Sequence, residues 1–187
     1  AQWSGQTPLM VCARTGNAAA VRLLLNWSAN VNAREAERGQ IALMAAVAGK
    51  HLDVVEALIE HGAEVNARTE SGFTPLKFAA QQGDLESARM LVANGANVNA
   101  IAEKYGNALT VATASGHESV ALFLLNAGSD PNVADTNGIT PLHYSLARGM
   151  AEIISAAPTS AYDDAYKVRP SNMRKLAKAL LDHGANP

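Results

Sequence analysis

The chain contains five histidines and one cysteine, the side chains that most often bind metal ions or act as nucleophiles and bases. The histidines are His51, His61, His117, His143 and His183, and long stretches of chain separate most of them. Cys12 stands where later segments carry Ala79 and Ala112, which indicates a small residue packed in a core. There is no phosphate-binding glycine loop, no H-E-x-x-H motif and no G-x-S-x-G motif. We therefore predict no catalytic, cofactor-binding or metal site and no enzyme.

Charged residues gather near the C-terminus. Asp163 and Asp164 are neighbours, so on a helix they would point about 100° apart and would not share a proton. A basic run without acids holds Lys167, Arg169, Arg174, Lys175 and Lys178. This run is either a site for a phosphate group or an acidic partner, or the solvated face of a helix. The leucines between the cations favour the solvated face.

The overall composition is that of a folded chain. Of 187 residues, 48% are hydrophobic and 17% are charged, which predicts one domain over residues 1–187. With 15 basic and 17 acidic residues the net charge is −2, so we expect no binding to nucleic acid or to a membrane surface. No apolar run approaches the roughly 20 residues of a membrane span, and no targeting segment is visible. We expect a soluble monomer and predict no compartment.

One pattern repeats along the chain at intervals of 33 or 34 residues. Its most regular part is a tripeptide, found as Thr7-Pro8-Leu9, Ile41-Ala42-Leu43, Thr74-Pro75-Leu76, Asn107-Ala108-Leu109 and Thr140-Pro141-Leu142. The first four units close with the related phrases WSANVNAR, HGAEVNAR, NGANVNAI and AGSDPNVA. The pattern therefore predicts five repeats, at about 1–34, 35–68, 69–101, 102–134 and 135–187.

Each repeat predicts a pair of helices. In the third repeat, Thr74 can cap a first helix that starts at Pro75, and Gly83 can end it. A second helix is predicted from about residue 85 to residue 93. Because such short helices are unstable alone, their apolar faces must pack against the neighbouring repeats. The sequence thus predicts an all-α repeat solenoid with polar fingers between its helix pairs.

The fixed period, the T-P start and the G-A-x-V-N close together resemble the ankyrin-repeat family over nearly the whole chain, and the degeneracy of the repeats resembles its bacterial members. The resemblance implies helix-turn-helix units joined by β-hairpin or loop fingers, with first helices and fingers on a concave side. It also implies a scaffold that binds another protein without catalysis. The alternative is a regulatory or targeting domain taken from a larger multidomain enzyme.

Two repeats depart from the pattern. Ile41 cannot cap a helix and Ala42 replaces the proline, so the second repeat should have the weakest helix start. Substituting both residues by threonine and proline is then expected to raise the midpoint of thermal unfolding. Ser28 and Lys50 stand where the other repeats have glycine, which predicts backbone strain at both positions.

The fifth repeat contains an insertion at about residues 150–171. Gly149 and Gly184 are 35 residues apart, whereas the equivalent Gly83 and Gly95 are 12 apart. We expect the first helix to run through Gly149 to about residue 157, and the second helix to begin near residue 173. A short helix carrying Tyr162 and Tyr166 is expected in between. These tyrosines either contact a partner or cover the end of the stack.

Finger tips and the open side of the first helices are the partner-binding positions that the resemblance implies. In this chain they are Trp3, Gln6, Arg14, Glu37, Arg38, Gln40, Glu70, Phe73, Gln81, Gln82, Glu103, Lys104, Tyr105, Thr136, Asn137, Ile139 and Arg148, with Tyr162 and Tyr166 from the insertion. Their mixed charges and aromatic rings suit a protein surface. We expect Trp3, Phe73 and Tyr105 to contribute most of the affinity. Tyr105 replaces a turn glycine, so its finger is expected to differ.

Overall fold

The structure is a computed structural model that describes residues 5–154 and 170–187, with side chains described for 5–147 and 174–187. Ten helices lie in these ranges. They are α1 (Pro8–Arg14), α2 (Ala18–Asn26), α3 (Ala42–Ala48), α4 (Leu52–Glu60), α5 (Pro75–Gln82), α6 (Leu85–Ala93), α7 (Ala108–Ser115), α8 (Glu118–Asn126), α9 (Pro141–Ile154) and α10 (Pro170–Asp182). The predicted all-α repeat solenoid is confirmed.

The first helices start and stop as their sequence predicts. The Thr74 hydroxyl accepts a hydrogen bond from the Lys77 amide, and the Asn107 side chain accepts one from the Thr110 amide. Pro75 occupies the first turn of α5, where a missing N–H removes no hydrogen bond. Gly83 ends α5 with φ of 68°, in the left-handed region that a glycine adopts without strain.

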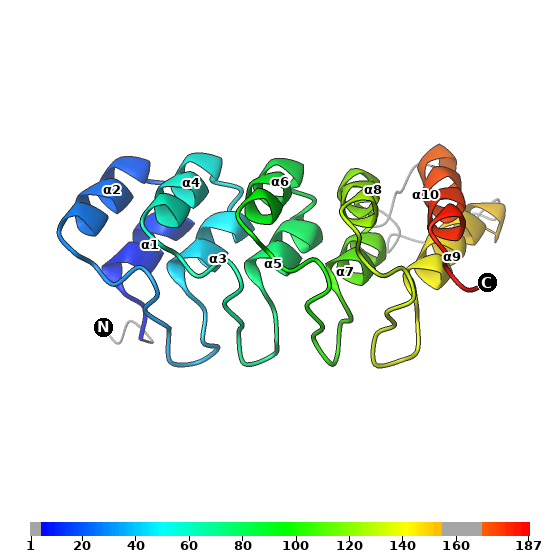
Figure 1. The fold of residues 1–187 in the computed structure, drawn as a ribbon, viewed down its shortest axis with the longest axis horizontal. Helices are drawn as coiled ribbons and strands as arrows, with labels where there is room; N and C mark the ends of the chain where they lie inside the picture. The colour runs from blue at the N-terminus through cyan, green and yellow to red at the C-terminus, as the bar shows by residue number, and fades with distance from the viewer. Residues whose placement is uncertain (1–4, 155–169) are drawn as a thin grey trace.

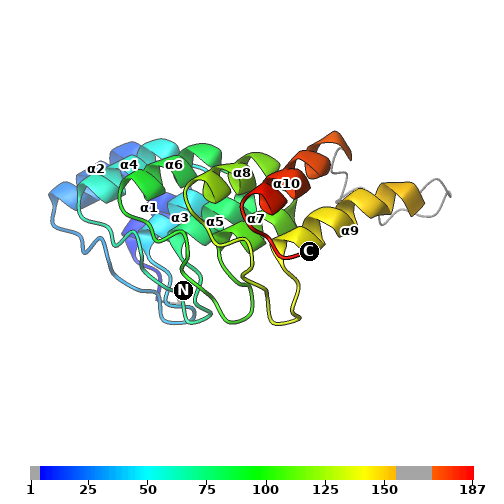
Figure 2. The same ribbon diagram turned by 45° about the vertical axis from the view of Figure 1, so that its right-hand side comes forward.

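The helices form two parallel rows with a finger layer beneath them (Figure 1). One row holds the first helix of each pair and the other holds the second, while the loops between repeats project away from both (Figures 1 and 2). The core lies between the rows, where Leu43, Leu58, Leu91 and Leu109 are fully buried. We call the surface between the first helices and the fingers the inner face.

Departures in the first two repeats have visible consequences. Ile41 makes no side-chain cap at the start of α3, as expected. Ser28 and Lys50 have φ of 60° and 58°, so both side chains occupy the left-handed region that glycine occupies in the equivalent positions. This confirms the strain predicted at the two positions, which costs on the order of 1 kcal/mol each.

In the fifth repeat, α9 continues through Gly149 and reaches Ile154, close to the predicted end. The second helix, α10, begins at Pro170 and is therefore longer at its start than the sequence indicated. The predicted short helix with Tyr162 and Tyr166 lies outside the described residues, as does Trp3.

The fingers are loops rather than regular hairpins. Within the described ranges there is one isolated bridge, between Ala102 and Gly106, and no strand. In the fourth finger Tyr105 does not adopt a positive φ. Gly106 does so instead, with φ of 68°, so the order of glycine and large residue is reversed relative to Gly72 and Phe73.

Candidate functional site

An asparagine ladder fixes each repeat to the next along the finger bases. The Asn32 side chain donates to the Gly62 carbonyl at 3.0 Å and accepts from the Glu64 amide at 2.8 Å. The same pair of bonds is made by Asn66 with Gly95 and Asn97, by Asn99 with Gly128 and Asp130, and by Asn132 with Gly184 and Asn186. Because each rung joins a side chain to two main-chain groups, it sets the register between successive fingers.

Two arginines and two histidines add further cross-links between repeats. Arg34 donates to the Arg68 carbonyl at 2.7 Å, and Arg68 donates to the Ile101 carbonyl. His51 and His117 donate through Nε2 to the carbonyls of Arg14 at 3.1 Å and Gln81 at 3.0 Å, in the preceding repeats. Fingers that are held in this way form a rigid wall beside the first helices.

A hollow lies on the inner face where the second, third and fourth fingers meet helix α5. We call it the main hollow because it gathers most of the predicted binding residues, although a neighbouring hollow is larger. The main hollow has a volume of about 370 Å³. Its lining residues are Glu37, Arg38, Gln40, Thr69, Glu70, Ser71, Phe73, Phe78, Gln81 and Tyr105. Two further hollows, of about 690 and 130 Å³, share Tyr105 as a wall.

Aromatic rings line this main hollow. The Phe73 ring packs edge-on against Phe78, with centroids 5.3 Å apart, and against Tyr105 at 4.9 Å. Phe73 is 8% exposed, so it supports the cluster from below, whereas Tyr105 is 44% exposed and presents its ring to solvent. The rings of this cluster that solvent reaches are therefore those of Tyr105 and the half-buried Phe78.

Tyr105 reaches this place because of the reversed order in its finger. A Cβ atom at Gly106 would lie 2.8 Å from the Thr110 hydroxyl and 3.1 Å from the Ala134 carbonyl, so no larger residue fits there. The aromatic side chain instead precedes the glycine and extends across to Phe73. The fourth finger therefore contributes to a cluster that otherwise belongs to the third repeat.

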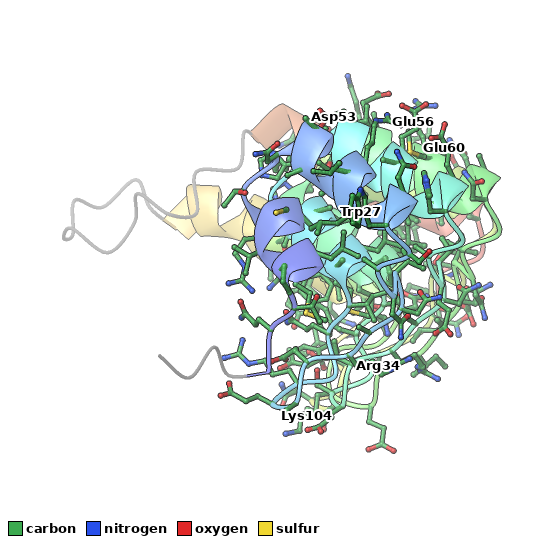
Figure 3. The ribbon with its side chains drawn as sticks, turned by 90° about the vertical axis from the view of Figure 1, so that its left-hand side faces the viewer. Trp27, Arg34, Asp53, Glu56, Glu60 and Lys104 are labelled. Carbon is green, nitrogen blue, oxygen red and sulfur yellow. The ribbon has the colours of Figure 1, made fainter. Side chains whose placement is uncertain are left out.

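Charged side chains surround the hollow without neutralising one another. Glu37, Arg38 and Glu70 are exposed and make no ion pair among the described residues. Lys104 lies at the outer edge of the fingers, and the acidic residues Asp53, Glu56 and Glu60 lie on the opposite side of the molecule (Figure 3). The rim therefore offers charges of both signs to a partner.

Asp135 and Tyr144 form the far wall of the smallest hollow. The Tyr144 hydroxyl donates to Asp135 at 2.6 Å, and the amides of Asn137 and Ile139 donate to the same carboxylate at 2.8 and 3.0 Å. Burial acts to raise the pKa of Asp135, but these hydrogen bonds outweigh it and lower the pKa below its ordinary value. The carboxylate thus stays ionised and holds the fifth finger against α9.

The structure accounts for the remaining reactive side chains as parts of the scaffold. His61 and His183 bond the carbonyls of Ala57 and Ala179 at 2.8 Å, and His143 bonds the Thr140 hydroxyl at 2.8 Å. Cys12 is half-buried against the core rather than fully enclosed. Over the part of the chain that the structure describes, no three histidines, cysteines or acids are placed to share a metal ion.

The structure gathers seven of the predicted binding residues around the main hollow. They are Glu37, Arg38, Gln40, Glu70, Phe73, Gln81 and Tyr105. Glu103 and Lys104 join Tyr105 in the second hollow, whereas Gln6, Arg14, Gln82, Asn137 and Ile139 line none of the three. Arg148 lies in α9, in the range without described side chains.

Phe78 and Tyr144 are inner-face residues that the sequence analysis did not propose. Each occupies the position that Val11, Ala45 and Val111 occupy in the other repeats. A large ring at a position that otherwise carries a small or medium side chain is the signal that would have identified both.

Comparisons with known proteins agree with this architecture. A family model described as ankyrin repeats (3 copies) matches residues 1–69, 32–102 and 66–135. The chain is 34% identical over 157 residues to the ankyrin repeat and KH domain-containing protein mask-1 of Caenorhabditis elegans, a match that covers 83% of this chain and 6% of that protein. It is 32% identical over 155 residues to mouse Rabankyrin-5, covering 80% of this chain and 13% of the relative.

A shorter match, 39% identical over 87 residues, joins 46% of this chain to 19% of the mouse B-cell lymphoma 3 protein homolog. The chain therefore spans only a small part of the length of these relatives. They are animal proteins, and the bacterial type stays a prediction. None of the described helices is long and apolar enough to cross a membrane.

Proposed function

The chain belongs to the ankyrin-repeat family, and we propose on this premise that it binds a partner protein through the inner face, at the hollow floored by aromatic rings. Ankyrin repeats are generally protein–protein interaction modules, so the family supplies the kind of activity. The choice of surface rests on one observation. Three successive repeats contribute Tyr105, Phe73 and Arg38 to the same hollow.

The chemistry of the hollow suits a polypeptide. A partner side chain that enters it removes the exposed ring of Tyr105 from water and contacts Phe78 at the base. Aromatic residues on a rigid support commonly provide a large share of the affinity at protein interfaces. The exposed Glu37, Arg38 and Glu70 then surround this contact with groups that can select a partner by charge.

Members of this family are typically non-catalytic scaffolds, and we propose that this chain acts without catalysis as well. The alternative proposal is that it serves as the regulatory or targeting part of a larger multidomain enzyme. Its matches to 6% and 13% of the relatives are compatible with a place in a longer polypeptide. They do not indicate an enzyme.

The proposal is tested by comparing variants of the whole chain in capture experiments from the extract of the source organism. Tyr105→Ala removes the exposed ring and should reduce the amount of captured partner at least tenfold. Tyr105→Phe keeps the ring and should retain most of it. Leu52→Ala, at a position 36% exposed on α4 in the row of second helices, serves as the matched control and should bind like the parent chain.

A fourth variant replaces residues 150–171 by a short turn. If this variant loses the partner while Tyr105→Ala keeps it, the insertion is the binding element and the hollow is not. Loss with Leu52→Ala as well would point to unfolding or to the outer surface, and a circular-dichroism spectrum of each variant separates these two outcomes.

A further inference from the structure

The asparagine ladder has an open position at the N-terminal end of the stack. In each later repeat, the asparagine of the preceding repeat binds one carbonyl and the amide two residues beyond it, such as the Gly62 carbonyl and the Glu64 amide. The equivalent groups of the first repeat are the Ser28 carbonyl and the Asn30 amide. Neither makes a hydrogen bond with any residue that the structure describes.

Ser28 holds this position in spite of strain. Its φ of 60° places its backbone in the region that Gly62, Gly95 and Gly128 occupy with φ of 83°, 86° and 88°. The first repeat therefore presents the same backbone shape to its open side that the later repeats present to their neighbours. An equivalent asparagine could bind there without rearrangement of the loop.

The same end of the stack also exposes an apolar side chain at a position that packs between repeats further along the chain. Leu23 is equivalent to Ala57, Met90 and Phe123 in the later repeats. Ala57 is completely buried, and the Arg89 guanidinium of the preceding helix lies 5.2 Å from the Phe123 ring centroid. Leu23 itself is 60% exposed.

Trp27 lies beside this position, at the end of α2, and is 82% exposed. Viewed along the stack from the first repeat, Trp27 lies on the near end of the molecule (Figure 3). Two large apolar side chains and two unpaired main-chain groups thus share one end face. An end face that met only solvent, as in a terminal capping repeat, would instead be polar.

We propose that this end face is a stacking interface for a further ankyrin repeat, which precedes residue 1 in the same polypeptide and supplies an asparagine to Ser28 and Asn30. The occupant is identified by continuity with the four existing rungs, each of which joins adjacent repeats in this geometry. Its second helix covers Leu23 as α6 covers Phe123 and lies beside Trp27.

The test fuses a copy of residues 68–100 directly ahead of Ala1, in the register in which that segment precedes Ile101. All variants carry Trp3→Phe, so that Trp27 is the only tryptophan. In the fusion we expect the emission maximum of Trp27 to move to shorter wavelength, and hydrogen exchange of the Asn30 amide to slow at least tenfold. The matched control carries Asn99→Ala within the copy and should lose most of the protection at Asn30.

Unchanged emission and unchanged exchange in a folded fusion would overturn the proposal. A shift in Trp27 emission that grows with the concentration of the unfused chain would show that a second copy covers the face, which overturns the proposed occupant. The full-length polypeptide gives an independent check. Since Asn32, Asn66, Asn99 and Asn132 recur every 33 or 34 residues, an asparagine is expected two or three residues ahead of Ala1. Another residue at both places contradicts the proposal.

Discussion

Lys77 is a charged side chain placed where no water reaches it. It is completely buried in α5, and its ammonium group makes no hydrogen bond with the described residues. Burial, together with the nearby charge of Arg68, lowers the pKa of Lys77 to about 8. The first two repeats carry Met10 and Met44 at the equivalent position, so an apolar side chain of similar length suits the site.

We expect Lys77→Met to raise the free energy of unfolding at pH 7 by about 3 kcal/mol, since the pKa of Lys77 falls from 10.5 to about 8 on folding and each pKa unit corresponds to about 1.4 kcal/mol. In the parent chain the unfolded state keeps the proton of Lys77 up to a pKa of 10.5, whereas the folded state releases it near 8. Stability of the parent therefore rises relative to the variant between these values, and the difference shrinks as the pH increases.

Urea unfolding of both proteins from pH 7 to pH 10.5 measures this difference. Parallel stability curves would show that Lys77 is not desolvated in the folded protein. The control is Lys50→Met, because Lys50 is exposed and its substitution should leave the pH dependence unchanged.

Individual residues are also where prediction from the sequence is least complete. Phe73 and Tyr105 were both expected at the binding surface, but the sequence does not say which ring is buried beneath the other. Lys77 is completely buried, but no local pattern in the sequence shows that a lysine is buried at this position. Seven predicted residues nevertheless line one hollow, because the repeat places equivalent positions on the same face.

At the scale of helices, the start of α3 combines two different effects. Ile41 provides no cap, but its side chain is completely buried, and the Ala42 amide makes no hydrogen bond with the residues that the structure describes. The backbone of Ile41, with φ of −111° and ψ of 167°, already suits a following proline. The two substitutions expected to act together from the sequence should therefore act in opposite directions.

We expect Ala42→Pro to raise the free energy of unfolding by about 0.5 to 1 kcal/mol, because proline restricts the unfolded chain and suits the first helical position. Ile41→Thr should lower it by about 1 kcal/mol, since the lost apolar burial outweighs the new cap. Thermal unfolding of the two single variants and the double variant measures both effects. A stabilising Ile41→Thr would show that the missing cap is the larger deficiency.

Helix positions were predicted well because their signals are local. Thr74, Pro75 and Gly83 fix α5 by capping and backbone geometry, and the second helix was expected at the residues where α6 lies. The start of α10 was missed by three residues, since Pro170 is itself a favourable first helical residue. The fingers lack such a signal, and their shape depends on cross-links such as the bond from Arg34 to the Arg68 carbonyl.

At the scale of the whole molecule, stability is distributed along one axis. The substantial helix contacts join the two helices of one repeat or helices of adjacent repeats, as in α5 with α6 and α5 with α7. Each repeat therefore depends mainly on its neighbours, and a local defect should loosen one part of the stack before the rest.

Leu109→Ala tests this expectation, because Leu109 is completely buried in α7 and its truncation should cost about 2 to 5 kcal/mol. Hydrogen exchange should accelerate most in α7 and α8 and least in α1 and α2. Leu23→Ala, which removes an exposed leucine, should leave exchange unchanged. Equal acceleration in every helix would show that the stack unfolds as one unit.

The overall architecture was predictable because the same pattern occurs five times in the sequence, at intervals of 33 or 34 residues. The ladder between repeats was not identified, although Asn32, Asn66, Asn99 and Asn132 recur at the same interval. Spacing shows that a residue is repeated, but the atoms that it binds lie in the next repeat and become visible only in three dimensions.

The ladder also bears on how such a gene can change. Each rung needs only one asparagine and the backbone of the following unit, so duplication or deletion of a whole unit leaves matching halves at the new junction. The fifth repeat illustrates this tolerance, since Asn132 binds Gly184 and Asn186 across the inserted segment. Unequal recombination in steps of one unit can therefore lengthen or shorten the array, whereas a break inside a unit separates an asparagine from its partner.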